Sequence, residues 1–137
     1  MGEEEPERLP RKPDVGADAF AALDLRVGRV VDVEDFPEAR TPAWKLTVDF
    51  GPAVGTLRTS AGVRGYPSRE LTGRLVVGAV NLGDKRIAGF TSQFLLLGAL
   101  APGGAVHLLH PDDPGPHAPA APGRRPSPGV PPGAPVA

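Results

Sequence analysis

The chain has 137 residues, among them 18 glycines, 18 prolines and no cysteine, and its formal net charge is −1. This length supports one domain with a modest core, and the lack of cysteine excludes a disulfide framework, a thiolate metal site and a cysteine nucleophile. Glycine and proline together reach a share at which disordered sequence is expected, so their distribution along the chain matters more than their average.

Residues 1–17 are predicted to form a disordered leader. The segment combines the acidic run Glu3–Glu5 with three prolines, and it has no sizeable apolar stretch. Such a composition cannot offset the entropy of ordering the backbone. It also lacks the apolar region of a secretory signal peptide, so a cytoplasmic location is predicted.

Residues 18–111 are predicted to form one domain built mainly from strands. In residues 44–50 apolar and polar side chains alternate without error, which is typical of a strand with one buried face. Residues 24–34 alternate too, but the phase changes near Gly28, which indicates a bulge or bend there with Val31 and Val33 facing inward afterwards. Further strands are predicted at 56–60, 75–80, 94–97 and 105–109.

Helical signals in this domain are weak and short. A turn of helix is predicted at 18–23, with Asp18 as its N-cap, and another at 68–71, closed by Gly73. Residues 51–55 are predicted to form a turn because they contain two glycines and a proline. The fold class is therefore all-β, a five-stranded OB-fold barrel with short helical connections, a disordered leader and a proline-rich tail.

Residues 112–137 are predicted to form a disordered Pro/Gly/Ala-rich tail. The last 27 residues hold ten of the 18 prolines, and only Val130 and Val136 are sizeable apolar side chains there. Nothing in the segment offers enough apolar surface for a core of its own.

Charge is divided unevenly along the domain. Residues 19–39 have a net charge of −3, whereas residues 40–110 hold eight basic groups and three acidic ones. A nearly neutral protein thus has a basic half, which favours an anionic partner.

Catalysis and membrane insertion are both disfavoured by the motifs present. The sequence contains no nucleophile elbow, no HExxH zinc motif and no P-loop. The uncharged stretch 87–110 is interrupted by polar residues, glycine and proline, so it does not predict a membrane span. We therefore predict a protein that is not an enzyme and has no metal site and no cofactor.

Residues 81–92 carry the most informative polar group of side chains. They directly follow the apolar strand 75–80, so their polar groups are held at a fixed strand end. Lys85 and Arg86 are adjacent cations suited to phosphate, and Asn81 offers a donor and an acceptor to a nucleotide. Gly89 allows a close backbone approach, and Ser92 adds a hydroxyl. The alternative is a turn asparagine, two solvated cations and a turn glycine.

Five segments, taken in order, resemble the tRNA-binding domain family, and the resemblance covers about residues 18–111. Within that family the sequence is most similar to the stand-alone bacterial CsaA-like proteins. Phe94-Leu95, where synthetase-appended members commonly have Gly-Met, favours this branch, whereas Gly83-Asp84 departs from its usual pair. The segments are 24–28, 36–40, 45–51, 59–62 and 81–92.

The resemblance implies an OB-fold that binds tRNA by its structure more than by its sequence, and a homodimer. It assigns RNA binding to the positions that match the family's motifs. CsaA-like proteins are also described as export-related chaperones, so binding of unfolded or precursor polypeptides is the alternative function. The matching positions are Asn81, Lys85, Arg86, Gly89, Ser92, Thr59 and Ser60.

A cationic groove across the middle strands follows from the pattern and the resemblance together. On an OB barrel the ligand lies over strands 2 and 3, so Arg40, Lys45 and Arg58 should join Lys85 and Arg86 in neutralising phosphates. The rings of Phe36, Tyr66 and Phe90 are candidates for base stacking, with packing as the favoured alternative. The aliphatic surplus in 94–97 and 105–109 predicts a dimer seam.

Overall fold

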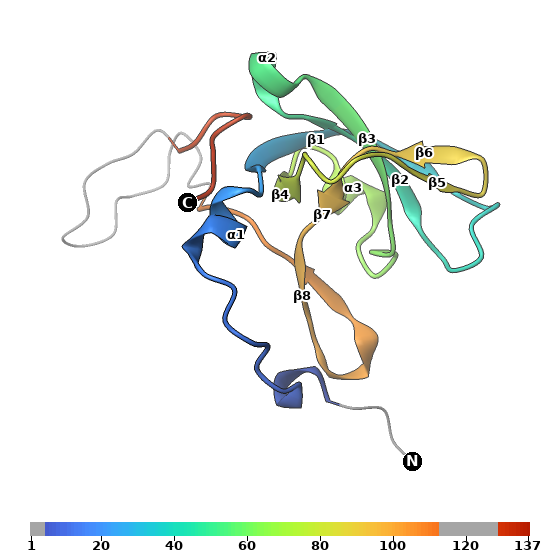
Figure 1. Cartoon of the computed structure of the whole chain (residues 1–137). Helices are drawn as coiled ribbons and strands as arrows, with labels where there is room; N and C mark the ends of the chain where they lie inside the picture. The colour runs from blue at the N-terminus through green and yellow to red at the C-terminus, as the bar shows by residue number, and fades with distance from the viewer. Residues whose placement is uncertain (1–4, 113–128) are drawn as a thin grey trace, which may run out of the picture.

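Five antiparallel strands form one sheet, in the order β3-β2-β1-β4-β7, in the computed structural model, which describes residues 5–112 and 129–137 (Figure 1). The two edges of the sheet approach each other, since Arg58 and Gln93 are joined by two hydrogen bonds of 2.9 and 2.7 Å. The result is a nearly closed barrel, and the predicted fold class is confirmed. The strands are β1 (Leu25–Asp35), β2 (Trp44–Asp49), β3 (Thr56–Ala61), β4 (Leu75–Ala79) and β7 (Leu95–Leu96).

Two small hairpins extend from this barrel. One pairs β5 (Lys85–Ile87) with β6 (Phe90–Ser92), a hairpin that the sequence pattern did not resolve. The other pairs β8 (Gly98–Leu100) with β9 (Val106–Leu108), which are joined by η2 (Pro102–Gly104).

The helices are single turns. They are η1 (Pro6–Arg8), α1 (Ala17–Ala21), α2 (Gly51–Val54) and α3 (Ser68–Leu71). The predicted cap of α1 is corrected, because Gly16 occupies the N-cap and Asp18 lies in the first turn. Across the two described ranges, no helix is long and apolar enough to cross a lipid bilayer.

Phe50 lies at the centre of the core. Its ring is fully buried and meets Phe94 edge-on, with the ring centroids 4.8 Å apart. Gly28 and Gly78 face this ring, and a Cβ at either position would lie 2.8 Å from ring atoms. The two glycines therefore leave the space that the aromatic ring fills.

The irregularity of β1 lies at a different place from the one predicted. The register against β2 shifts between Val30 and Asp32, and Val31 is 49% exposed instead of facing inward. A bulge adds one residue to a strand and turns its side chain out of the alternation. Gly28 is needed for the close approach to Phe50.

The two ends of the chain differ from each other. In the leader, η1 has no buried residue and no side-chain cap. Residues 129–137, by contrast, lie along the first half of β1 and hydrogen-bond to Val27 and Leu25, which departs from the expected disordered tail. The rest of that predicted tail, 113–128, lies outside the described residues.

Candidate nucleic-acid interface

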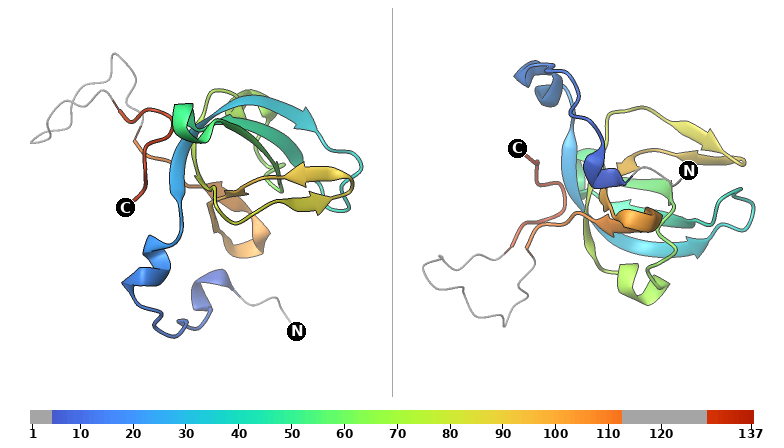
Figure 2. Two further views of the ribbon diagram at one scale, coloured as in Figure 1. Left: turned by 45° about the horizontal axis from the view of Figure 1, so that its top comes forward. Right: turned by 90° about the horizontal axis from the view of Figure 1, so that it is seen from below.

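The β5–β6 hairpin carries the two adjacent cations that the sequence singled out. Its turn consists of Ala88 and Gly89, with φ angles of +46° and +82°, and two left-handed residues give the tight connection that matches the twist of the strands. Lys85 and Arg86 are both exposed. Figure 2 shows the hairpin extending from the barrel beside the loop that joins β1 to β2.

Lys85 and Arg86 lie on opposite faces of this hairpin. Lys85 pairs across the strands with Ser92, and Arg86 pairs with Thr91 and donates to its Oγ1 at 2.9 Å. Cross-strand partners share a face, and Ser92 faces the barrel. Lys85 is therefore on the barrel side, and Arg86 is on the outer side.

A small second core holds the hairpin in place. Phe90 meets Phe36 edge-on at 5.5 Å between ring centroids, and Ala43 completes the buried cluster. Burial of aromatic rings contributes much of the packing energy in small clusters. The cluster fixes the hairpin against the β1–β2 loop, so the cations of both are presented together.

Two cations cover the rings of this second core. The Lys45 ammonium lies 4.8 Å from the Phe36 centroid and 5.3 Å from the Phe90 centroid. The Arg58 guanidinium lies 4.9 Å from the Phe90 centroid and donates to Glu34 at 2.8 Å. Cation–π contacts hold a charge without neutralising it. Lys45 is thus positioned with its charge available, whereas Arg58 shares its charge with a carboxylate.

The three rings considered for base stacking are packed within the protein. Phe36 is 3% exposed and Phe90 is 9% exposed. Tyr66 is half-buried, and its hydroxyl accepts a hydrogen bond from the Leu108 amide at 3.1 Å. The packing alternative therefore describes all three, and the interface relies on charge.

Thr59 and Ser92 form a buried link between β3 and β6. Their hydroxyls are 2.9 Å apart, and Thr59 also donates to the carbonyl of Phe94 at 2.8 Å. A ligand cannot reach these groups without opening the barrel. Ser60, in contrast, is half-buried next to Lys45 on the neighbouring strand and on the outer face.

Asn81 ties the helix α1 to the barrel. Its Oδ1 accepts from the Asp24 amide, and its Nδ2 donates to the Ala22 carbonyl, both at 2.8 Å. These two bonds use both ends of the side-chain amide. Of the two interpretations, the geometry favours the turn asparagine.

Replacing Asn81 with alanine is expected to lower the free energy of unfolding by about 1 kcal/mol, because two hydrogen bonds are lost at a solvent-accessible site. Affinity for RNA, the ligand that the sequence predicts, should stay unchanged at temperatures where the variant is folded. Chemical denaturation and filter binding measure the two quantities. Asn81→Asp keeps the acceptor for the Asp24 amide, so its free energy of unfolding should lie between those of Asn81→Ala and the unaltered protein. A loss of RNA affinity in both variants would contradict this assignment.

Arg40 lies near a further arginine that the sequence did not single out. A hollow of about 240 Å³ is lined by Arg40, Phe36 and Arg64, among others. The Arg64 guanidinium stacks 3.8 Å from the Trp44 ring centroid and pairs with Asp35 at 2.5 Å. Arg64 sits in the irregular segment after β3, where alternation gives no signal.

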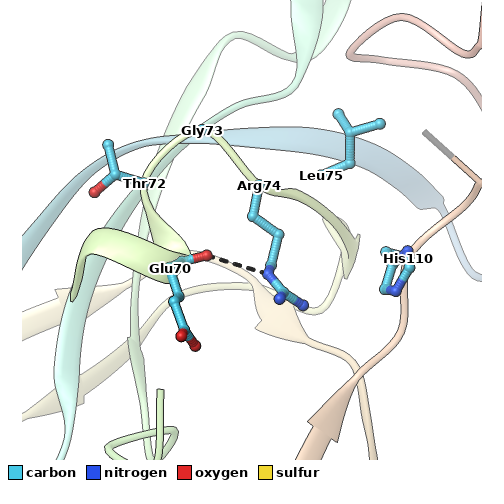
Figure 3. A pocket seen from close by; sticks show the side chains of 6 residues that line it. All are labelled: Glu70, Thr72, Gly73, Arg74, Leu75 and His110. Atoms are coloured by element: carbon cyan, nitrogen blue, oxygen red, sulfur yellow. Dashed lines mark hydrogen bonds between the residues drawn. The ribbon is translucent and has the colours of Figure 1, made fainter. Parts of the chain in front are cut away.

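A separate hollow lies at the turn between α3 and β4, and it contains none of the predicted residues (Figure 3). Its volume is about 360 Å³, and Arg74 and His110 form two of its walls. The Arg74 Nε donates to the carbonyl of Glu70 at 3.3 Å. In residues 5–112 and 129–137, no three His, Cys, Asp or Glu side chains gather where they could hold a metal ion.

With this geometry established, comparison with known proteins decides the family. The family model described as "Putative tRNA binding domain" matches residues 25–119. The chain belongs to this family. The predicted resemblance is thereby confirmed for the barrel and its β5–β6 hairpin.

Relatives of this tRNA-binding domain include much longer proteins. The methionine–tRNA ligase of Pyrococcus abyssi is 44% identical over 96 residues, which are 69% of this chain and 13% of the ligase. Methionine–tRNA ligase 1 of Sorangium cellulosum is 39% identical over a match that covers 75% of this chain and 14% of the ligase. The chain therefore spans only a small part of the curated relatives it matches.

Solved structures of similar size match along their whole length. The CsaA chaperone protein of Picrophilus torridus is 34% identical, with a TM-score of 0.76 over 90% of this chain and 100% of its own. The chaperone CsaA of Bacillus anthracis is also 34% identical, with a TM-score of 0.73 over 91% of this chain and 100% of its own length. The likeness to CsaA-like proteins thus extends to the arrangement of the strands.

Proposed function

We propose that this chain binds tRNA, without catalysis of its own, by neutralising phosphates along the β5–β6 hairpin and the adjoining face of β2 and β3. The observation that carries the proposal is the fixed pair of exposed cations, Lys85 and Arg86, on a hairpin packed beside Lys45. Membership of the tRNA-binding domain family supports the choice of ligand. A tRNA ligand supports the cytoplasmic location that we propose for this chain.

The contact set that we propose is smaller than the set predicted from sequence. Residues that reach the surface bind phosphate or a 2′-hydroxyl, since phosphate contacts position an RNA and need accessible donors. The buried or fully bonded residues Asn81, Thr59 and Ser92 hold the hairpin and α1 in place, and Gly89 forms the turn. The proposed contacts are Arg40, Lys45, Arg58, Ser60, Lys85 and Arg86.

A filter-binding titration of total tRNA against salt tests this function. The affinity should fall with salt along a log–log slope of about −3.5 to −4.5, as expected for five cations at about 0.7 to 0.9 per phosphate. An unstructured RNA of equal length is the control and should bind more weakly. Binding that does not change between about 50 and 200 mM salt would contradict a phosphate-based interface.

A second candidate function is polypeptide binding by a homodimer, and exposed apolar side chains favour it. Leu95 is 52% exposed, Leu100 is 60% exposed and Leu109 is 45% exposed, although Phe94 and Leu108 of the predicted seam are buried. The helix α1 and the β8–β9 hairpin both lie below the barrel in the view of Figure 1, and Phe20 of α1 is 49% exposed. Two of the similar solved structures are CsaA chaperones.

Sedimentation equilibrium at micromolar concentration is expected to show a dimer, and Leu100→Glu is expected to shift it to monomer because a charge would be buried in an apolar seam. Val31→Glu, at a similarly exposed position in the five-stranded sheet and outside the β8–β9 hairpin, should leave the mass unchanged. If the unaltered protein sediments as a monomer, the proposed homodimer is wrong. Suppression of client aggregation, measured on both variants, shows whether polypeptide binding needs the seam.

A further inference from the structure

The last residues of the chain complete a gap beside β1. The pairing of β2 with β1 starts at Arg29, so the preceding residues of β1 have no β2 partner on that side. The chain end fills this position: Gly133 donates to the Val27 carbonyl at 2.7 Å, and the Val27 amide donates to Ala134 at 2.9 Å. Val136 donates to the Leu25 carbonyl at 2.9 Å. The segment thus lies antiparallel along β1, with a single β-bridge between Arg26 and Pro135, and takes the place of a short added strand.

Main-chain bonds, with little apolar burial, hold this added strand. None of residues 129–137 is buried, and Val130 is 37% exposed. Pro135 bridges to Arg26, at a position where a proline without an amide proton is tolerated. Binding by main-chain hydrogen bonds is how extended peptides add to a sheet edge. Such a strand can leave without removing any core side chain.

One side chain of β1 also contacts the added strand. The Arg26 Nη1 donates to the Gly133 carbonyl at 3.2 Å, while its Nε donates to the Asp24 carboxylate at 2.6 Å. The hydrogen bond that Arg26 donates to the Asp24 carboxylate raises the pKa of Arg26 above its ordinary value. The Asp24 carboxylate thus orients the guanidinium to donate a hydrogen bond to a carbonyl of an extended chain.

Glycine is required where the added strand crosses the barrel. Gly133 has φ +94°, and a Cβ there would lie 2.7 Å from the Phe50 carbonyl oxygen. On the barrel side, a Cβ at Gly51 would lie 2.4 Å from the Pro132 carbonyl oxygen. The two backbones approach too closely here for any side chain. The bound segment must therefore have glycine at this position.

We propose that the β1 edge from Leu25 to Val27 is a binding site for an extended, proline- and glycine-containing polypeptide segment, occupied here by the C-terminal segment of the same chain. A segment of another polypeptide with glycine at the crossing point binds the same edge when the resident strand leaves. This site is independent of the proposed RNA contacts.

The first experiment uses the full chain with Gly133→Val, which disfavours the resident strand through its φ angle and the contact with Phe50. A fluorescein-labelled peptide of the sequence GVPPGAPVA should bind this variant at least about tenfold more tightly than the unaltered protein, where the tethered strand competes at an effective concentration on the order of millimolar. The peptide GVPPVAPVA is the matched control and should not bind. A folded variant that does not bind GVPPGAPVA overturns the proposal.

Hydrogen exchange on the unaltered protein gives a second test that does not depend on the variant. If the strand leaves on its own, the amides of Gly133 and Val136 exchange at least about 100-fold faster than the Val30 amide, which donates to Arg74 inside the barrel. Equal protection of these amides would show an integral strand and would overturn the proposal, whatever the behaviour of the variant. Retained tRNA binding by Gly133→Val distinguishes this site from the RNA interface.

Discussion

Replacing Lys85 and Arg86 together with alanine is expected to weaken tRNA binding by about 30- to 150-fold. Each charge-assisted contact to phosphate contributes about 1 to 1.5 kcal/mol, and 1.4 kcal/mol is a tenfold change in Kd. Both side chains are exposed, and neither forms an ion pair within the described part of the chain, so their loss leaves no buried group unpaired. The thermal transition should therefore stay where it is in the unaltered protein.

The position of the two residues on opposite faces of the hairpin makes the single variants informative. Lys85 is on the side of Lys45 and the barrel, whereas Arg86 is on the outer side with Thr91. If the RNA lies over β2 and β3, Lys85→Ala should cost more affinity than Arg86→Ala. Filter binding at several salt concentrations measures the affinities, and each lost contact should reduce the log–log slope by about 0.7 to 0.9.

A charge-matched control separates local contacts from the overall field. Lys12→Ala with Arg69→Ala removes the same charge from exposed positions in the leader and in α3. This control should change Kd by less than about threefold, because exposed charges beyond about 10 Å are largely screened at 0.1 M salt. Equal losses in the two double variants would show that net charge alone drives binding, and the hairpin would lose its proposed role.

Phe50→Ala is expected to lower the free energy of unfolding by about 3 to 5 kcal/mol, the range for truncating a fully buried aromatic residue. The ring fills the space that Gly28 and Gly78 leave, and it packs edge-on against Phe94. Because small domains are stable by only about 5 to 15 kcal/mol, much of the population should unfold at moderate temperature. Urea denaturation followed by circular dichroism measures the change.

Val31→Ala provides the matched control for this prediction. Val31 is a strand residue in the same sheet, but it is 49% exposed at the bulge of β1. Truncating it should change the free energy of unfolding by about 0.5 kcal/mol or less. A similar loss in both variants would mean that the barrel does not depend on the Phe50 contact.

The β-barrel was predictable because alternation is a local property. The strict alternation of 44–50 and the apolar run 75–80 predict β2 and β4, and the structure places them beside β1 in one sheet. The bulge of β1 was misplaced for a physical reason. Gly28 interrupts the pattern in the sequence, but it does so to admit Phe50, whereas the extra residue is Val31.

The chemistry of the interface was predictable in part. Adjacent cations in a basic half of the chain indicate an anionic ligand, and the structure presents Lys85 and Arg86 to solvent. The partners of Asn81, Thr59 and Ser92 were not predictable, since those bonds join residues 33 to 59 positions apart. A polar side chain in a list of motif residues does not show whether its hydrogen bonds go to a ligand or to the protein.

Composition and charge along the chain predicted one small domain with a basic half, between two proline-containing ends. The pattern also determined the class of fold, because strands and turns are specified by neighbouring residues. Only the tertiary structure decided which polar groups stay available and that residues 129–137 return to β1. That return depends on main-chain hydrogen bonds and on two glycines, Gly51 and Gly133, whose backbones meet across the fold. Glycine, whose abundance suggested disorder, allows this close approach at two positions of the fold.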